Sequence, residues 1–308
     1  MQLPYSEELN IGYLSRLFDN TTNCYKFFWF QAILRKVDDA HCRFTFDELI
    51  NEMIADAWYM VTECHLRLGP LGIMDNLEEV VKYIYEKYGF PSSEKREKIL
   101  EFLQTTDDRK IAKYKSDLTL NVGSEMCIRD RLYRLQVPFY DEINIEKNMW
   151  NGSKQILTRE INRQKRLMYY FSLISGLGTV IEVDSLWAEY LCRHKEILKA
   201  WTQLKLIQYL QNKNPSVPGI ADKLEAPESR NIEHVRKYWK LIIEIKPSLK
   251  DIYGEVTLGE ENISVDHFVP WQYVAHDELW NLHPTTKSIN SSKSNSLPSW
   301  KKEGLIIL

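Results

Sequence analysis

Residues 265–298 read V-D-H-F-V-P-W-Q-Y-V-A-H-D-E-L-W-N-L-H-P-T-T-K-S-I-N-S-S-K-S-N-S-L-P. Apolar and polar residues alternate at the start of residues 263–269, which favours a strand, and Pro270 ends the pairing of that strand. Residues 280–283 are a second strand candidate, and residues 287–295 favour a short helix. The sequence therefore predicts the order strand, loop, strand and helix.

The chain ahead of this segment carries helical patterns. Apolar and aromatic residues recur at helical spacing in residues 22–37, and we interpret them as core, since such residues are more often buried than used to stack bases. Thr45 and Glu48 form a capping box, and Gly89 is placed to end a later helix. Ser185 is placed to cap a long helix that ends before Asn214.

Pro247 marks the expected domain boundary, because the helical pattern stops there. The predicted fold class is α+β, with a mostly helical N-terminal domain over residues 1–246 and a small C-terminal module over residues 247–308. With 308 residues, of which 44% are hydrophobic, the chain is long enough to bury a core.

Charge and cysteine content limit the classes of function. A net charge of −3 gives no global sign of a nucleic-acid partner, so any phosphate-binding surface must be local. The five cysteines form no C-x-x-C pair and lie far from residues 265–298, which excludes a cysteine-held zinc site there and favours a reducing compartment. The start of the chain has no secretory signal pattern, and no apolar run reaches the ~20 residues that span a bilayer. We expect a cytoplasmic protein that does not enter the membrane.

Residues 122–131, V-G-S-E-M-C-I-R-D-R, have neither a helical nor a strand period. The decapeptide resembles a translated sequencing adapter, and its composition would also suit an ordinary irregular loop. We therefore derive no function from Cys127 or its neighbours.

The residues of the C-terminal segment suit hydrolysis of a phosphodiester bond. Such a reaction is helped by a hard cation such as Mg²⁺, which takes one or two protein oxygen ligands, and by a base that removes a proton from water. Asp266 offers a carboxylate, Asn290 an amide oxygen and His267 the base. Neighbours on a regular strand point to opposite faces, so Asp266 and His267 share a site only if the strand ends or bends there, which Pro270 favours.

The pattern D-H-x-x-P, followed by Asn281 and then by Asn290 in N-S-S-K-S, resembles the HNH endonuclease motif, whose family has a ββα-metal fold. Its spacing is similar to that of the HNH domain of RNA-guided CRISPR effectors. The chain also resembles bacterial HNH endonuclease-domain proteins with a helical N-terminal region, in which stretches like residues 13–22 and 25–30 recur.

The resemblance implies a role for each matching residue. His267 is the general base, Asp266 and Asn290 are the metal ligands, and Asn281 holds the loop backbone that aims His267. Lys293 lies three residues after Asn290, on the same helical face, and is a phosphate contact. Asn290 occupies the position of the last histidine in the HNH motif. An asparagine at this position favours Mg²⁺ or Mn²⁺ over softer metals. The implied substrate is DNA, and the implied context is defence against foreign DNA.

DNA needs a basic surface that the acidic C-terminal module lacks. Arg159, Arg163 and Arg166 recur along one helical face, and a second basic cluster covers residues 236–250. A charge ridge is usually a solvated face, but a nuclease requires a phosphate-binding surface, so we expect one of these two to contact DNA.

Some alternatives remain open. His276-Asp277 resembles the metal-binding pair of an HD-type phosphohydrolase, but no partner His or Asp lies at suitable spacing. Asp277 is better placed to open a helical turn. His283 is either a further ligand or, as we prefer, a structural residue. The rival function is a nucleic-acid-binding protein with an inactive or truncated HNH site. The sequence also leaves homo-oligomers open.

Overall fold

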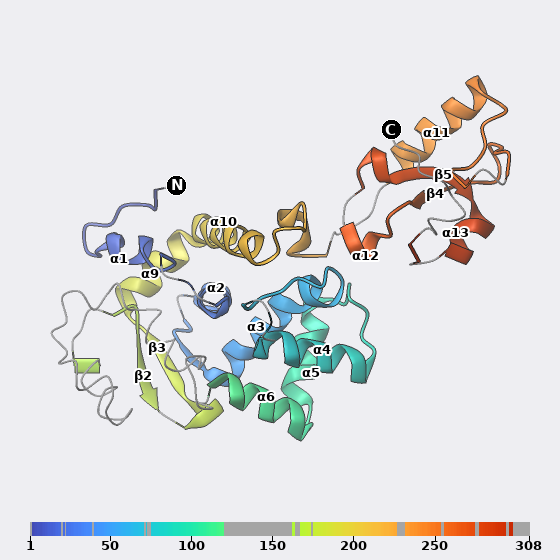
Figure 1. Ribbon diagram of the computed structural model, residues 1–308. Helices are drawn as coiled ribbons and strands as arrows, with labels where there is room; N and C mark the ends of the chain where they lie inside the picture. Colours follow the sequence, from blue (N-terminus) through green and yellow to red (C-terminus); the bar gives the residue numbers. More distant parts are fainter. Residues whose placement is uncertain are drawn as a thin grey trace. The chain divides into compact units, whose positions relative to one another are not determined.

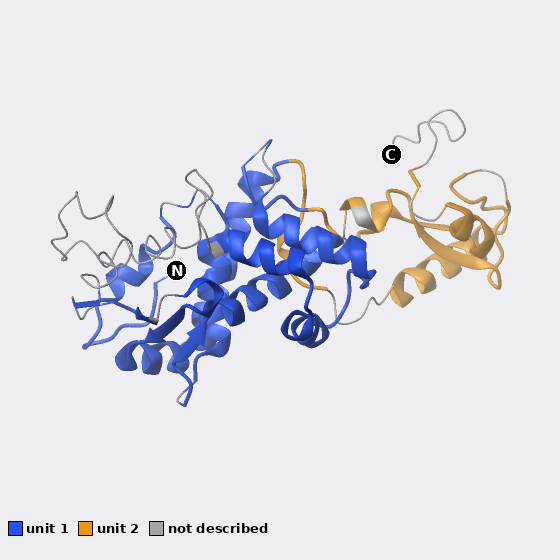
Figure 2. Cartoon of the chain, turned by 90° about the horizontal axis from the view of Figure 1, so that it is seen from below, with its two compact units in different colours: residues 1–62, 66–215 blue, residues 63–65, 216–308 orange. Residues whose placement is uncertain are grey.

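The structure is a computed structural model of the 308-residue chain. It describes residues 2–19, 21, 23–38, 40–70, 72, 75–119, 162–163, 167–173, 175–226, 232–253, 256–274, 277–293 and 296–297. Two compact units, coloured separately in Figure 2, divide the chain: unit 1 is Met1–Thr62 with Leu66–Pro215, and unit 2 is Glu63–His65 with Ser216–Leu308. Helices and small antiparallel sheets make up both units, which confirms the predicted α+β class.

Helices form most of the described part of unit 1. They are α1 (Ile11–Ser15), α2 (Tyr25–Lys36), α3 (Phe46–Thr62), α4 (Asn76–Tyr88), α5 (Arg96–Thr105), α6 (Arg109–Thr119), α9 (Ser185–Arg193) and α10 (Lys195–Lys213). Two of them, α2 and α3, lie at the centre of the unit (Figure 1). Helix α2 packs against α3 and α10, while α3 also contacts α4 and α5. The aromatic side chains of α2 are buried, Trp29 completely, so they are core.

Local sequence signals explain where several helices start and stop. The amide of Glu48 donates to Oγ1 of Thr45 at 3.2 Å, and the amide of Thr45 donates to the Glu48 carboxylate at 2.7 Å, which is a capping box at the start of α3. Gly89 ends α4 with a left-handed φ of 68°. The expected cap at Ser185 is wrong: the Asp184 carboxylate accepts from the amides of Leu186 and Trp187.

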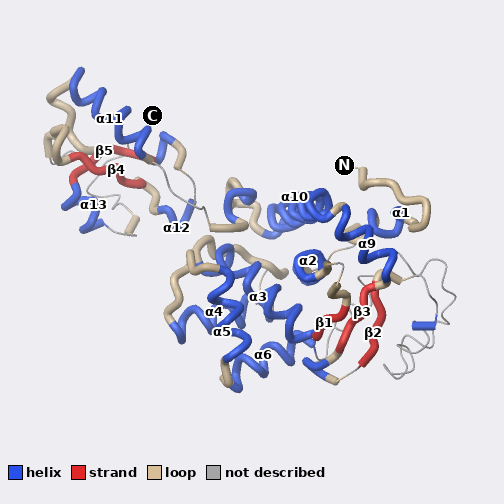
Figure 3. The backbone as a smooth tube through the Cα atoms, turned by 180° about the vertical axis from the view of Figure 1, so that it is seen from behind, coloured by secondary structure: helices blue, strands red, loops and turns tan. Residues whose placement is uncertain are grey.

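The predicted long helix after Ser185 is also two helices, because the chain leaves helical geometry at His194, between α9 and α10. A small sheet, which the sequence did not predict, accompanies these helices. Its strands are β1 (Arg43–Thr45), β2 (Tyr169–Leu173) and β3 (Val180–Val183), with η3 (Gly176–Gly178) before β3. They pair antiparallel in the order β1-β3-β2, so β3 is central. Figure 3 shows these strands in red beside the helices of unit 1.

Unit 2 is built on a pair of antiparallel strands. Its elements are η4 (Ile220–Lys223), α11 (Glu233–Ile245), β4 (Ile263–His267), α12 (Trp271–Val274), η5 (Leu279–Asn281), β5 (Leu282–Thr286) and α13 (Lys287–Lys293). Both α11 and α13 contact both strands, and Figure 1 draws the two helices on opposite sides of the strand pair. The predicted order of strand, loop, strand and helix is therefore present over residues 263–293.

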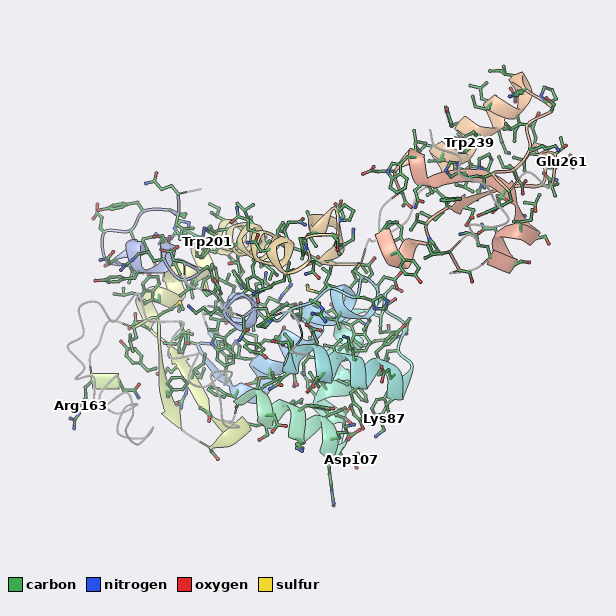
Figure 4. All side chains as sticks on the ribbon, viewed as in Figure 1. Lys87, Asp107, Arg163, Trp201, Trp239 and Glu261 are labelled. Atoms are coloured by element: carbon green, nitrogen blue, oxygen red, sulfur yellow. The ribbon has the colours of Figure 1, made fainter. Side chains whose placement is uncertain are left out.

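Helix α11 supplies the apolar support of the strand pair. Val235 is buried with Val265 and Leu282, and Ile243 with Leu258 and Ile263. Burial of side chains of this size stabilises a fold by about 1.5–3 kcal/mol each. The indole of Trp239, labelled in Figure 4, donates to the carbonyl of Leu282 at 3.0 Å.

Apart from Glu63–His65, the compact unit that contains the strand pair covers the chain from Ser216, ahead of the boundary expected at Pro247, and its helix α11 packs on β4 and β5. The division of the chain into a helical domain over residues 1–246 and a C-terminal module over residues 247–308 stays a prediction. Within the described ranges, no helix is long and apolar enough to span a bilayer.

Candidate active site

Asp266 lies near the end of β4 and is 4% exposed. Two donors hold its carboxylate: the hydroxyl of Tyr253 lies 2.7 Å from Oδ2, and the Nζ atom of Lys293 lies 3.2 Å from Oδ2 and 3.3 Å from Oδ1. A buried carboxylate is strongly unfavourable without such partners. The orientation of Asp266 is therefore fixed from two directions, by the loop before β4 and by α13.

Lys293 ends α13 and points into the unit, with a side chain that is 8% exposed. Besides the Asp266 carboxylate, its Nζ atom donates to the backbone carbonyl of His267 at 2.6 Å. The ammonium is thus surrounded by oxygen atoms of β4. In this arrangement, Lys293 is buried beside Asp266, whereas the sequence predicted that it would contact phosphate.

Asn290 lies one turn before Lys293 on α13. Its side-chain nitrogen Nδ2 donates to Oγ of Ser264 at 2.9 Å and to the carbonyl of Val265 at 3.2 Å. Because the amide nitrogen is used by β4, the atom of this side chain that can serve as a metal ligand is the carbonyl oxygen. The structure therefore brings Asp266, Asn290 and Lys293 together from one strand and one helix.

His267 is the last residue of β4, directly after Asp266. Its Nε2 atom lies 2.7 Å from Oδ1 of Asp277, and the two side chains are 15% and 26% exposed. The ring also makes an edge contact with Trp271, with centroids 5.7 Å apart. Asp277 does not open a helical turn, since the residue that precedes η5 is Glu278, and its carboxylate meets His267 instead.

Asn281 is completely buried between β4 and β5. Its Oδ1 atom accepts from the amide of Val269 at 2.7 Å, and its Nδ2 atom donates to the carbonyl of Val269 at 2.8 Å. The amide of Phe268 donates to the backbone carbonyl of Asn281 at 2.9 Å. These three bonds tie the two residues that follow His267 to the start of β5.

His283 lies on β5 opposite Asp266. Its Nε2 atom donates to the carbonyl of Trp280 at 2.8 Å, and its ring lies beside Trp239 and Phe268. Burial lowers the pKa of His283, although the Trp280 carbonyl and the Asp266 carboxylate oppose this shift. These contacts agree with a structural residue better than with a metal ligand.

The oxygen donors around Lys293 suit a hard divalent cation. The Asp266 carboxylate and the His267 carbonyl already surround a positive charge, the Lys293 ammonium, and the Asn290 amide lies one turn away on the same helix. Mg²⁺ and Mn²⁺ prefer such oxygen ligands. Within the described ranges, no three His, Cys, Asp or Glu side chains cluster as a metal site, so any cation here would rely on carbonyl, amide and water oxygens.

The predicted basic ridge is mostly outside the described residues. Arg159 and Arg166 fall there, as do residues 122–131, while Arg163 is exposed in unit 1 (Figure 4). The second cluster is partly on α11, within unit 2, where Lys237 and Lys246 are exposed and Arg236 pairs with Glu233 at 2.8 Å. The ridge and the strand pair belong to different units.

Sequence reasoning missed two residues that contact the candidate site, Tyr253 and Asp277. Tyr253 lies in an irregular loop before β4, where no periodic pattern points to it. Asp277 carried a usable signal, because it follows His267 by only ten residues and lies between the two predicted strands. A loop that returns to the same strand end brings such residues together.

The family model described as HNH endonuclease matches residues 251–299. The matched span contains β4, β5 and α13, with all four residues of the predicted motif, which confirms the resemblance seen in the sequence. No curated protein and no solved structure matches the chain.

Proposed function

From the HNH endonuclease domain at residues 251–299, which indicates a nuclease acting on nucleic acid, we propose that this protein hydrolyses phosphodiester bonds of DNA in a reaction that needs Mg²⁺ or Mn²⁺. The observation that carries the proposal is that the Asp266 carboxylate and the His267 carbonyl hold one positive charge, the Lys293 ammonium, between β4 and α13. Asn290 lies one turn before Lys293 and is bonded to the same strand, at Ser264 and Val265. Such a group of oxygen atoms suits a divalent cation beside a phosphate.

We assign each side chain of the site a separate role in the reaction. Asp266 and Asn290 would hold the cation, which would supply stabilisation of the negative charge that develops on the phosphate oxygens. His267 takes a proton from a water molecule as the oxygen of that water bonds to phosphorus. The bond from phosphorus to the leaving oxygen breaks, and this oxygen takes a proton from a second water molecule. Tyr253 keeps the Asp266 carboxylate in place through its 2.7 Å hydrogen bond.

Two further residues, Asn281 and Lys293, contact the segments that carry His267 and Asp266. Asn281 fixes the backbone after His267, so the imidazole keeps its direction during the reaction. Lys293 would be released from the Asp266 carboxylate if a divalent cation were held there, and its ammonium would then be able to contact a phosphate of the bound strand. The same lysine thus fits both its observed buried position and the phosphate contact implied by the resemblance.

DNA is held by basic side chains other than these residues. Arg159, Arg163 and Arg166 form one candidate surface, and Lys237, Lys240 and Lys246 form the other, on and just after α11. A role in defence against foreign DNA is implied by the resemblance. The cysteines without C-x-x-C pairs favour a reducing compartment, such as the cytoplasm.

Plasmid nicking tests this function directly. Wild-type protein should convert supercoiled plasmid to the open-circle form with Mg²⁺ or Mn²⁺ and lose this activity in EDTA. His267→Ala should lose at least about a hundredfold in rate, since a positioned general base contributes that much. His41→Ala, which changes an exposed histidine of unit 1, is the matched control. Equal rates for wild type and His267→Ala would refute the assignment.

The rival function predicts a different result. A nucleic-acid-binding protein with an inactive HNH site would bind DNA but nick it with neither metal. Circular dichroism and a cooperative unfolding curve must accompany that result, so that loss of the fold is not taken for lack of activity.

A further inference from the structure

A short polar contact joins the His267 side chain to Asp277. Nε2 of His267 lies 2.7 Å from Oδ1 of Asp277. An ionised aspartate only accepts hydrogen bonds, so the hydrogen between the two atoms belongs to Nε2. In a neutral imidazole, the lone pair then lies on Nδ1.

The residue that follows Asp277 is held in place by two hydrogen bonds. The amide of Asn281 donates to the carbonyl of Glu278 at 2.9 Å, and the Trp280 indole donates to the Glu278 carboxylate at 2.7 Å. The side chain of Asn281 is itself bonded to Val269, two residues after His267. The same structural element therefore anchors both partners of the His267–Asp277 bond.

The surroundings strengthen this bond. His267 is 15% exposed and Asp277 is 26% exposed, so water screens the pair less than it would on an open surface. The Trp271 ring covers another part of the imidazole, with an interplanar angle of 79°. The hydrogen bond to Asp277 and the contact with Trp271 together restrict the rotamers of the imidazole.

We propose that Asp277 is a positioning residue, which fixes His267 in the tautomer that carries its hydrogen on Nε2 and presents the Nδ1 lone pair to the attacking water. Asp277 itself touches neither substrate nor cation. Its carboxylate also stabilises the imidazolium formed when Nδ1 takes the proton, as a buried carboxylate does in other acid–base pairs. This inference rests on the proposed function for its consequence in catalysis, but the tautomer can be measured without any reaction.

The first measurement is the tautomer of His267. Full-length protein labelled with ¹⁵N is studied in EDTA at about pH 8, where an ordinary imidazole is neutral. Long-range ¹H–¹⁵N spectra distinguish a protonated from an unprotonated ring nitrogen, and loss of the signal in His267→Gln gives the assignment. Wild type should show hydrogen on Nε2. Asp277→Ala should show a mixture of tautomers, and Asp277→Asn should shift towards hydrogen on Nδ1, because its amide can donate to Nε2.

The second measurement separates positioning from binding. Asp277→Ala and Asp277→Asn should lower kcat for plasmid nicking at least about tenfold, with the Kd for DNA within twofold of wild type. Asp277→Glu keeps the carboxylate and should recover part of the lost rate. Glu261→Gln, which changes an exposed acid of the same unit, is the control and should match wild type.

The outcomes are distinguishable. A tautomer unchanged in both Asp277→Ala and Asp277→Asn would overturn the proposal, whether or not kcat falls, and so would an altered tautomer with an unchanged kcat. If wild type fails to nick DNA, the proposed function fails, whereas the tautomer spectra still decide whether Asp277 fixes His267. Asp277→Asn is nearly isosteric, so it serves if Asp277→Ala does not fold.

Discussion

Lys293 and Asp266 neutralise each other in the interior of unit 2, with Nζ at 3.2 Å from Oδ2 and both side chains less than a tenth exposed. The carboxylate proposed as a metal ligand thus already has a cation. Under the proposed function, a divalent metal held by Asp266 would compete with that ammonium, so the buried Lys293 would oppose metal binding.

Replacement of Lys293 by methionine should therefore strengthen metal binding. We expect Lys293→Met to lower the Kd for Mn²⁺ by about tenfold in calorimetric titrations without DNA, which corresponds to about 1.4 kcal/mol. Lys287→Met changes an exposed lysine on the same helix and should leave the Kd as in wild type. Weaker Mn²⁺ binding in Lys293→Met would contradict the placement of the metal at Asp266.

The same replacement should reduce stability without metal. Removal of one partner from a buried ion pair typically costs about 3–5 kcal/mol, because the remaining charge stays buried. We expect Lys293→Met to melt at a lower temperature than wild type in EDTA and to recover most of the difference in Mn²⁺. A melting temperature that Mn²⁺ leaves unchanged would argue against metal replacing the ammonium.

Replacement of Asn281 should lower the free energy of unfolding. Asn281→Ala leaves the amide and carbonyl of Val269 without their partners in the interior, which we expect to cost about 2–4 kcal/mol in the free energy of unfolding. Urea titration measures this loss. Asn262→Ala, which removes a single hydrogen bond at an exposed turn, should cost about 1 kcal/mol or less. Equal losses for the two variants would show that the Asn281 bonds contribute little.

His283 should make stability depend on pH. Burial lowers its pKa in the folded state below the ordinary value of about 6.5, so the unfolded chain binds the proton more readily. The contribution of this residue is therefore fully present above pH 6.5 and is lost as the pH falls below that value, towards the folded pKa. The free energy of unfolding, measured from pH 5 to 7.5, should fall less steeply with acid in His283→Asn than in wild type.

The basic ridge gives a prediction about DNA. Reversal of Arg159, Arg163 and Arg166 to glutamate should weaken DNA binding and flatten its salt dependence, by a slope of about 0.9 for each phosphate that the protein no longer neutralises. Fluorescence anisotropy over a range of salt concentrations measures both. An unchanged affinity at moderate salt would leave Lys237, Lys240 and Lys246 as the candidate surface, for which the same reversal is the parallel test.

Patterns that depend on near neighbours in the sequence predicted much of this fold. The capping box at Thr45, the left-handed Gly89 and the aromatic face of α2 each involve residues within a few positions, and each is present in the structure. The strand, loop, strand and helix outline of residues 263–293 also follows from local periodicity and Pro270.

Contacts between residues that are distant in the sequence could not be predicted from local sequence patterns. Strand β3 joins β1 to β2 across more than a hundred residues, and none of these strands carries a long alternating pattern. The contact of Tyr253 with Asp266 depends on the path of an irregular loop. The burial of Lys293 depends on how α13 sits on β4, which helical spacing alone does not determine.

The dependence of the strand pair on α11 limits which fragment can be excised as a portable nuclease. The family match begins at residue 251, yet Val265 and Leu282 share their core with Val235, and the Leu282 carbonyl is bonded to Trp239. A fragment cut at residue 251 would expose that apolar side to water, whereas one cut ahead of Glu233 keeps it covered. Transplantation into another protein should therefore succeed only with the longer piece.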